Sequence, residues 1–151
     1  MTINEEKREL FTVPQGYYLA HCISGDYTLG AGIAKQFDVN YNMKFKLKKQ
    51  FEIPIDQMRN TYIYDKYVGN ALLVDNVFNL VTKARCYHSP TYEDLESALI
   101  DMKEKMEMLD VTKLAIPQLS CGLDRLEWSK VKELIEDVFE DTDVEILVCI
   151  L

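Results

Sequence analysis

The sequence has few residues of the kinds that bind metals or form redox centres. It holds two histidines and four cysteines in 151 residues, and the cysteines are widely separated, with no C-x-x-C spacing. Structural zinc sites and redox dithiols need closely spaced ligands, so neither is expected. We expect no metal, no cofactor and reduced thiols, as in a cytoplasmic protein.

Long apolar runs and linkers are also absent. Residues 5–9 are mostly charged, which is too polar for a signal peptide, and no apolar run is long enough to span a bilayer. No repeat or Gly/Ser/Pro-rich segment divides the chain, so residues 1–151 are predicted to form a single domain without membrane contact. A monomer is expected, because no exposed apolar helix face is evident.

Positive charge is scarcer than negative charge. The sequence has 25 acidic and 17 basic residues and a formal net charge of -8, which repels the phosphate backbone of long nucleic acid. One basic run, residues 44–49, alternates lysines with apolar residues and indicates the solvated face of a short amphipathic helix.

The spacing of apolar residues predicts two long helices. Leu95, Leu99 and Met102 recur at helical spacing in the first, over residues 91–109, where Thr91 and Asp94 form a capping pair. The second helix is predicted over 128–139, with one apolar stripe opposite acidic residues.

Buried strands are predicted between and around these helices, because short apolar runs are bounded by turn residues. Strands alternate with helices along most of the chain, which favours a layered α/β domain with a mixed sheet. The predicted strands are 17–23, 113–117 and 144–151, with a hairpin of 71–74 and 77–81 around Asp75-Asn76.

Two loops lie after a predicted strand and before a predicted helix, where open α/β sheets bind ligands. The first, residues 24–34, contains Gly30 and Gly32, which let the backbone approach a ligand closely. A helix beginning near Ile33 would present free N–H groups to a phosphate. A tight strand-to-helix turn explains the same G-x-G spacing equally well.

The second loop, residues 117–126, offers backbone amides between Ser120 and Leu123 that would form a concave anion site. Asp124 would lie beside that site as an acid/base group. Its alternative role is to favour the dipole of the following helix.

Lys83 directly follows a predicted buried strand, so its amine is expected at a sheet end, partly desolvated and able to act as a nucleophile. Most lysines instead extend their amine into water. His21 lies within an apolar strand and is interpreted as a hydrogen-bonded core residue, and a packing role is favoured for Cys121.

Three groups of segments together resemble one family. They are 19–24 with 30–34, 80–83 with 90–93, and 121–126 with Trp128. In this order and spacing they resemble the macrodomains, and within them the terminal ADP-ribose protein glycohydrolase subgroup. The resemblance implies a three-layer α/β/α sandwich with a mixed central sheet that binds ADP-ribose in a cleft at the strand ends.

The resemblance also implies roles for individual residues. Lys83 would be the nucleophile that attacks the anomeric carbon of the distal ribose, and Asp124 would transfer the proton and resolve the adduct. The diphosphate and distal ribose would contact the two loops, and Leu10 and Leu151 would border the adenosine. The substrate-binding residues implied are Glu9, Leu10, Ser24, Gly30, Ala31, Gly32, Gln118, Leu119, Ser120, Cys121, Gly122, Leu123 and Leu151.

Two positions depart from the family pattern. Many macrodomains have Gly-Asp after the first strand, whereas this chain has Arg8-Glu9, so Glu9 would accept the hydrogen bond of the adenine amine unless Arg8 pairs with it. Ser120 replaces a usual glycine, and a positive φ there would cost roughly 1 kcal/mol.

The function implied is removal of mono-ADP-ribose from acidic side chains, with ADP-ribosylated protein as the partner. The enzyme alternatives are hydrolysis of O-acetyl-ADP-ribose or ADP-ribose 1″-phosphate and action on ADP-ribosylated nucleic acid. A further alternative is a non-catalytic module that binds ADP-ribose. The presence of both Lys83 and Asp124 favours an enzyme, because a binding module needs no amine at the anomeric carbon.

Overall fold

Six strands form the central sheet of the protein, which the computed structural model describes over residues 1–151. The strands are β1 (Thr2–Lys7), β2 (Tyr18–Ser24), β5 (Ala71–Val74), β6 (Val77–Lys83), β7 (Lys113–Ile116) and β8 (Glu145–Ile150). They lie in the order β1-β8-β7-β2-β6-β5, and every neighbouring pair is parallel except β5 and β6. The predicted mixed sheet is therefore confirmed.

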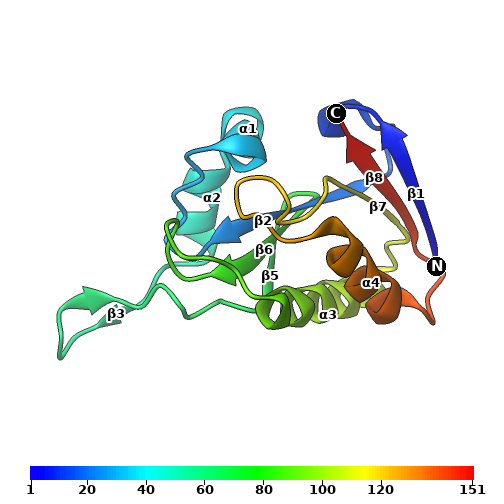
Figure 1. Ribbon diagram of the computed structural model, residues 1–151. Helices are drawn as coiled ribbons and strands as arrows, with labels where there is room; N and C mark the ends of the chain where they lie inside the picture. Colours follow the sequence, from blue (N-terminus) through cyan, green and yellow to red (C-terminus); the bar gives the residue numbers. More distant parts are fainter.

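Two pairs of helices cover the two faces of the sheet (Figure 1). The helices are α1 (Gly32–Tyr41), α2 (Met43–Gln50), α3 (Tyr92–Leu109) and α4 (Trp128–Phe139), and a short 3-10 helix, η1 (Leu10–Thr12), precedes β2. Leu99 of α3 and Ile135 of α4 belong to one buried cluster, and Phe37 of α1 and Leu47 of α2 belong to another. The three-layer α/β/α arrangement is confirmed.

Strand β2 shows why both faces of the sheet are apolar. Leu19 and Ile23 pack with α1 and α2, whereas Ala20 between them packs with α3 and α4. Successive side chains of a strand point to opposite faces, so a strand covered on both sides needs a continuous apolar run.

The predicted helices occur where the apolar spacing placed them. The bounds of α4 agree with the prediction, and the start of α3 is capped by Thr91, whose side chain accepts a hydrogen bond from Asp94 N at 3.1 Å. The basic run forms α2, which buries Met43 and Leu47 and leaves most of its lysines at the surface.

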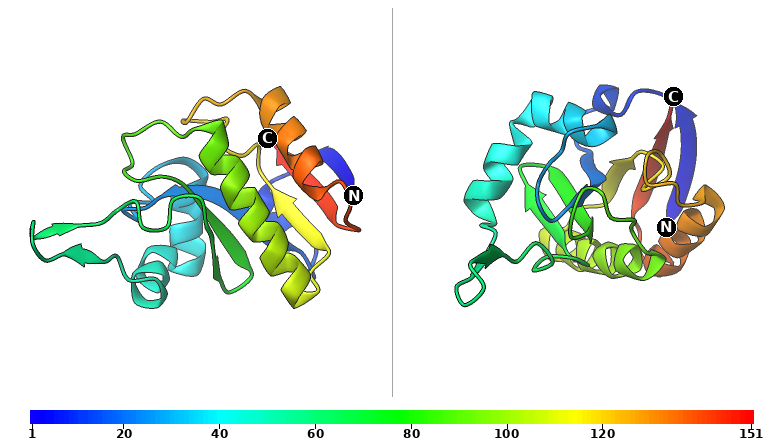
Figure 2. Two further views of the ribbon diagram at one scale, coloured as in Figure 1. Left: turned by 90° about the horizontal axis from the view of Figure 1, so that it is seen from below. Right: turned by 60° about the vertical axis from the view of Figure 1, so that its left-hand side comes forward.

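Strand β1 and a projecting hairpin were not predicted. β1 is polar and mostly exposed because it is an edge strand that pairs only with β8. The hairpin consists of β3 (Ile55–Asp56) and β4 (Thr61–Tyr62), which pair with each other and extend away from the body of the protein (Figure 2). Neither segment has the apolar alternation that marks a strand against a core.

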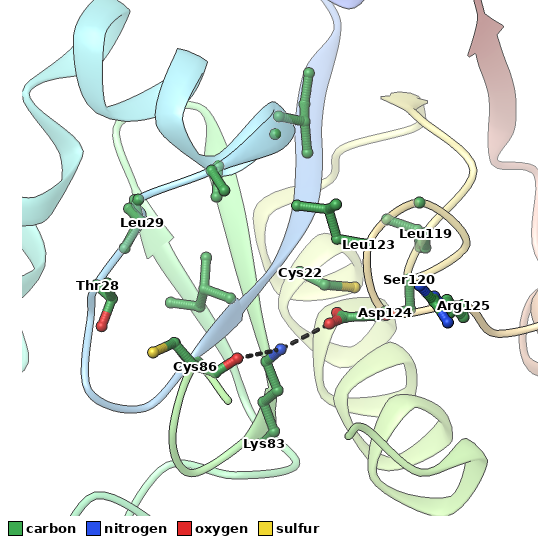
Figure 3. A pocket seen from close by; sticks show the side chains of 18 of the residues that line it. Cys22, Thr28, Leu29, Lys83, Cys86, Leu119, Ser120, Leu123, Asp124 and Arg125 are labelled. Atoms are coloured by element: carbon green, nitrogen blue, oxygen red, sulfur yellow. Dashed lines mark hydrogen bonds and ion pairs between the residues drawn. The ribbon is translucent and has the colours of Figure 1, made fainter. Parts of the chain in front are cut away.

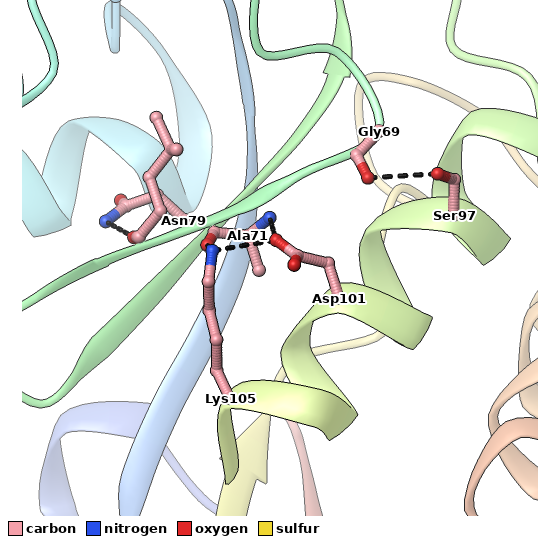
Figure 4. A network of polar contacts seen from close by, with 7 residues as sticks. Gly69, Ala71, Asn79, Ser97, Asp101 and Lys105 are labelled. Carbon is pink, nitrogen blue, oxygen red and sulfur yellow. Dashed lines mark hydrogen bonds and ion pairs between the residues drawn. The ribbon is translucent and has the colours of Figure 1, made fainter. Parts of the chain in front are cut away.

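Helix α3 protects the outer edge of the sheet at β5 (Figure 4). Asp101 Oδ2 accepts a hydrogen bond from Ala71 N at 2.7 Å, and Lys105 Nζ donates to the Ala71 carbonyl and, at 2.8 Å, to Asp101. Ser97 Oγ donates to the Gly69 carbonyl at 3.0 Å. An edge strand exposes unpaired backbone groups, so these contacts satisfy groups that the sheet itself leaves open.

A buried polar pair lies beneath α1. His21 Nε2 is 2.5 Å from Asn79 Oδ1, and the His21 ring stacks on Phe37 with ring centroids 3.9 Å apart. Asn79 Nδ2 donates to the Leu72 carbonyl at 3.0 Å. The interpretation of His21 as a hydrogen-bonded core residue is confirmed, and burial lowers its pKa from 6.5 to about 4, although the Asn79 contact acts in the opposite direction.

The turn after β2 packs against two other backbone segments. A Cβ atom on Gly25 would lie 1.9 Å from the Tyr64 carbonyl oxygen and 3.3 Å from the Ala84 carbonyl oxygen. Gly25 N also donates to the Lys83 carbonyl at 2.8 Å. Only glycine allows this approach, and the turn is thereby fixed to the end of β6.

None of the helices combines the length and the apolar character needed to cross a bilayer. No group of three or more His, Cys, Asp or Glu side chains lies together in a way that could hold a metal ion.

We predict that acid destabilises the fold through His21. Its pKa is lowered in the folded state, so the unfolded state binds the proton first, and stability is lost as the pH falls from 6.5 towards 4. The loss is about 3 kcal/mol for a shift of this size. Urea unfolding at several pH values should show the wild type losing this stability relative to His21→Gln, with His88→Gln as an exposed control. Parallel curves for the wild type and His21→Gln would contradict the prediction.

We also predict that Gly25→Ala destabilises the protein by about 1–3 kcal/mol, because the added methyl group must displace the Tyr64 carbonyl. Gly122→Ala is the matched control, since a Cβ there meets nothing within 4 Å. Thermal or urea unfolding measures both, and equal stabilities for the two variants would show that the turn tolerates a side chain.

Candidate active site

Three segments meet at one edge of the sheet and enclose a cleft of about 1140 Å³. Strands β2, β6 and β7 are mutually parallel, so the loops that follow them all leave from this edge. The carboxyl ends of strands are where open α/β sheets bind ligands. The residues that line the cleft fall into three groups: 22–24 with 28–34, Lys83 with 86–89, and 117–120 with 122–125.

Lys83 and Asp124 meet across this cleft (Figure 3). Lys83 Nζ lies 2.6 Å from Asp124 Oδ1 and donates a second hydrogen bond to the Cys86 carbonyl at 3.0 Å. The side chains are 13% and 21% exposed. Both are partly withdrawn from water, which strengthens the interaction relative to a surface ion pair.

The start of α1 faces the cleft with free backbone amides. Ala31 precedes the helix in an extended conformation and forms no side-chain cap, and the first helical hydrogen bond runs from Lys35 N to the Ala31 carbonyl. The amides of Gly32, Ile33 and Ala34 therefore have no acceptor within the helix. Gly32 has a φ of 58°, a conformation that favours glycine. This arrangement provides an anion site.

The second loop is held in a tight conformation by two residues with positive φ. Ser120 has a φ of 57° and Arg125 a φ of 62°, and Leu126 N donates to the Ser120 carbonyl at 2.8 Å. Ser120 thus occupies the left-handed region without being glycine, which costs roughly 1 kcal/mol. Its hydroxyl is buried without a hydrogen-bond partner. The loop places Gly122 and Leu123 at the surface beside Asp124.

Asp26 connects the first loop to the segment after Lys83. Its carboxylate accepts hydrogen bonds from Ser24 Oγ at 2.6 Å, Thr28 N at 3.2 Å and Cys86 N at 2.9 Å. Burial by itself would raise the pKa of Asp26, but the hydrogen bonds from Ser24, Cys86 and Thr28 outweigh it and lower that pKa. A negative charge is therefore fixed between the two segments.

Two thiols near the cleft, those of Cys22 and Cys121, are poor nucleophiles. Burial raises the pKa of Cys22 to about 12 and the pKa of Cys121 to about 11, so both are protonated at neutral pH. Cys22 lines the cleft, with its sulfur directed towards Asp124 (Figure 3). Cys121 does not line it and donates to the Leu119 carbonyl at 3.1 Å, which fits the expected packing role.

Most of the residues singled out from the sequence line the cleft, but four do not. Leu10 is buried in the core against α1 and α2, and Leu151 is 82% exposed at the end of β8. Glu9 is exposed before η1, and Arg8 pairs with Glu6 at 3.7 Å, so no ion pair with Arg8 engages the Glu9 carboxylate. Charge alone did not reveal which of the two glutamates lies on the same side of the backbone as Arg8. Cys121 is the fourth residue outside the lining.

Sequence reasoning missed several lining residues. Cys86 to Ser89 lie beyond Lys83 in a connection that carries no motif, although its position after Lys83 was a usable signal. Cys22 lies between buried residues on β2, and it reaches the cleft only because it is close to the end of the strand. Thr28 and Leu29 fill the first loop between its glycines, and Leu29 adopts a φ of 43°.

Comparisons with known proteins agree with this architecture. No family model matches the chain. A human protein named ADP-ribose glycohydrolase OARD1 is 40% identical over 146 residues, which covers 94% of this chain and 87% of the human protein.

Two solved structures share the fold. The macrodomain of Thermus aquaticus DarG has a TM-score of 0.77 and 23% identity, with 99% of each chain covered. Thermosipho africanus DarTG in complex with ADP-ribose has a TM-score of 0.70 and 17% identity, covering 97% of this chain and 41% of that chain. The extent of the identity and the shared fold together show that this chain belongs to the macrodomain family, in the subgroup of the ADP-ribose glycohydrolases.

Proposed function

We propose that this protein is an ADP-ribosyl glycohydrolase that releases mono-ADP-ribose from acidic side chains, with Lys83 as nucleophile and Asp124 as acid/base group. The observation that carries the proposal is the contact of 2.6 Å between Lys83 Nζ and Asp124 Oδ1 within the cleft. The human relative is named an ADP-ribose glycohydrolase, which supports the same reaction.

The cleft suits ADP-ribose in size and polarity. Its volume of about 1140 Å³ exceeds the usual range for small-molecule sites, so an extended nucleotide fits. The free amides of Gly32 and the following residues would hold one phosphate, and those near Gly122 the other. The structure of Thermosipho africanus DarTG in complex with ADP-ribose supports this ligand. The sequence-based assignment of Glu9, Leu10 and Leu151 to the adenosine end stays a prediction, because none of the three lines the cleft.

The first chemical step begins with a proton transfer. Lys83 donates its proton to Asp124 across 2.6 Å and becomes a neutral amine. The amine then attacks the anomeric carbon of the distal ribose, a C–N bond forms, and the C–O bond to the acceptor breaks with its electron pair leaving on the acceptor oxygen. The products are a free carboxylate on the acceptor and a sugar adduct on Lys83.

The second step releases the sugar. After the acceptor carboxylate has left, Asp124 gives the proton that it took from Lys83 to solvent and becomes a carboxylate again. It then removes a proton from a water molecule that attacks the same carbon, the C–N bond breaks with its electron pair returning to the Lys83 nitrogen, and that amine takes the proton from Asp124. Binding energy from the diphosphate positions the ribose for both steps.

An ester to a glutamate or aspartate is the linkage that fits this machinery. A carboxylate leaves without being protonated, so Asp124 stays available as the base for Lys83. The thiols of Cys22 and Cys121 are protonated and therefore do not compete with Lys83 as nucleophiles. A module that only binds ADP-ribose would gain little from burying an ion pair, because its desolvation opposes the attraction.

We predict that Lys83→Ala lowers release of ADP-ribose from glutamate-modified protein by at least about a thousandfold, since it removes the nucleophile. ADP-ribose binding, measured by calorimetry, should stay within about threefold, because the anion sites are backbone groups. Lys46→Ala is the matched control, as Lys46 forms a 2.6 Å ion pair with Asp75 outside the cleft. Unchanged turnover in Lys83→Ala would refute the lysine mechanism.

Parallel assays of the wild type with ADP-ribosylated DNA and O-acetyl-ADP-ribose rank these substrates against glutamate-modified protein.

For Asp124→Ala we predict an adduct on Lys83 that forms more slowly than in the wild type, because Lys83 must lose its proton to water, and that is then resolved slowly, because no base activates the attacking water. Intact-protein mass spectrometry after incubation with modified protein should show the added mass of ADP-ribose, and peptide mapping should place it on Lys83. Asp75→Ala serves as the control. A fully active Asp124→Ala enzyme without an adduct would remove Asp124 from the mechanism.

A further inference from the structure

Asp26 is a charged residue close to the site that does not line the cleft. Its two carboxylate oxygens accept hydrogen bonds from two different segments of the chain. Oδ1 accepts from Ser24 Oγ at 2.6 Å and Thr28 N at 3.2 Å within the first loop, while Oδ2 accepts from Cys86 N at 2.9 Å. Asp26 and Cys86 are 60 residues apart in the sequence. The carboxylate therefore fixes the backbone beyond Lys83 to the loop that begins α1.

The same residue, Cys86, contacts Lys83 through its other backbone group. Its N–H donates to Asp26 and its carbonyl accepts from Lys83 Nζ at 3.0 Å (Figure 3). Cys86 itself is exposed, so no packing of its side chain holds the backbone in place. The hydrogen bond to Asp26 is the long-range contact that fixes the position of this carbonyl.

The hydrogen-bonding geometry of an amine explains what the Cys86 carbonyl contributes to the site. A neutral lysine amine has two N–H groups and one lone pair at tetrahedral positions. In this site the Cys86 carbonyl and Asp124 Oδ1 are the two acceptors, and both lie within hydrogen-bond distance of Nζ. Once the proton has passed to Asp124 Oδ1, the Cys86 carbonyl is the acceptor that still holds an N–H of the amine, and it fixes the position of Nζ while the lone pair turns from Asp124 to the ligand.

We propose that Asp26 is a positioning residue for Lys83, which keeps the amine nitrogen in place during the reaction by holding the Cys86 carbonyl as its hydrogen-bond acceptor. The proposal rests on the proposed function, because it gives Lys83 the role of nucleophile. Asp26 touches neither the substrate nor the reacting atoms.

A purely structural role for Asp26 makes a different prediction. If the carboxylate only stabilised the first loop, its loss would weaken ADP-ribose binding and lower protein stability. The kcat calculated per total protein would then fall only in proportion to the fraction of protein that remains folded. A positioning role lowers kcat and leaves KM and ADP-ribose affinity nearly unchanged, because the free amides at the start of α1 do not depend on the exact position of Lys83 Nζ.

The test compares Asp26→Ala and Asp26→Asn with the wild type on glutamate-linked mono-ADP-ribosylated protein. We expect kcat to fall by about tenfold to a hundredfold in Asp26→Ala, the scale of a misplaced reacting group, with KM and the ADP-ribose Kd within about threefold. Asp26→Asn should recover part of kcat, because its amide oxygen can still accept from Cys86 N. The matched control is Asp56→Ala, whose carboxylate also accepts backbone hydrogen bonds, from Met58 N at 3.1 Å and Arg59 N at 3.3 Å, but on the projecting hairpin.

A second measurement does not need activity. Amide hydrogen exchange followed by NMR should show faster exchange at Cys86 N in Asp26→Ala, and unchanged exchange there in Asp56→Ala. The positioning role would be overturned if kcat of Asp26→Ala stayed within twofold of the wild type, or if KM and Kd rose by as much as kcat fell. A Lys83→Ala variant as active as the wild type would instead refute the proposed function, so the two failures are distinguishable.

Discussion

Lys83 and Asp124 are 41 residues apart in the sequence, and their contact depends on the parallel pairing of β6, β2 and β7. Parallel strands all end at the same edge of a sheet, so the segments that follow them must share the space beyond it. α1 and α2 on one face, and α3 and α4 on the other, bury both sides of these strands. The site is therefore located at the end of strands that are buried on both faces, and its loops extend from that framework.

The electrostatics of the site separate three kinds of group. The Lys83–Asp124 pair is charged and partly desolvated, the thiols of Cys22 and Cys121 are kept neutral by burial, and Asp26 is kept ionised by its hydrogen bonds. Lys83 and Asp124 are in direct contact at 2.6 Å, the distance that the proposed proton transfer needs. In the proposed mechanism the chemistry belongs to this amine and this carboxylate, and the backbone amides bind the anion.

Conformations with positive φ occur repeatedly in the loops around the cleft. Gly32 adopts one without strain, whereas Leu29, Ser120 and Arg125 adopt it with a side chain, which costs energy at each position. The surrounding contacts hold these residues in place, as Leu126 N does for Ser120. The result is a set of loops whose amides are oriented before any ligand arrives, which reduces the ordering that binding must cause.

The sequence by itself determined the elements that face the core. Apolar spacing located α3 and α4 and the strands β2, β5, β6, β7 and β8, because burying an apolar face requires a regular period. It also placed Lys83 at the end of β6 and Asp124 in a glycine-containing loop, and the resemblance to macrodomains supplied their partnership. β1 and the hairpin of β3 and β4 were not predicted, because neither buries an apolar face.

Only the tertiary structure decided which groups meet. The contact of Asp26 with Cys86, the approach of Gly25 to the Tyr64 carbonyl and the pairing of Arg8 with Glu6 leave no pattern in the sequence. Each depends on the direction of a side chain or the path of a loop, and these follow from how strands and helices pack rather than from local composition. The cleft is for the same reason a property of the assembled sheet, since its lining comes from three separate segments of the chain.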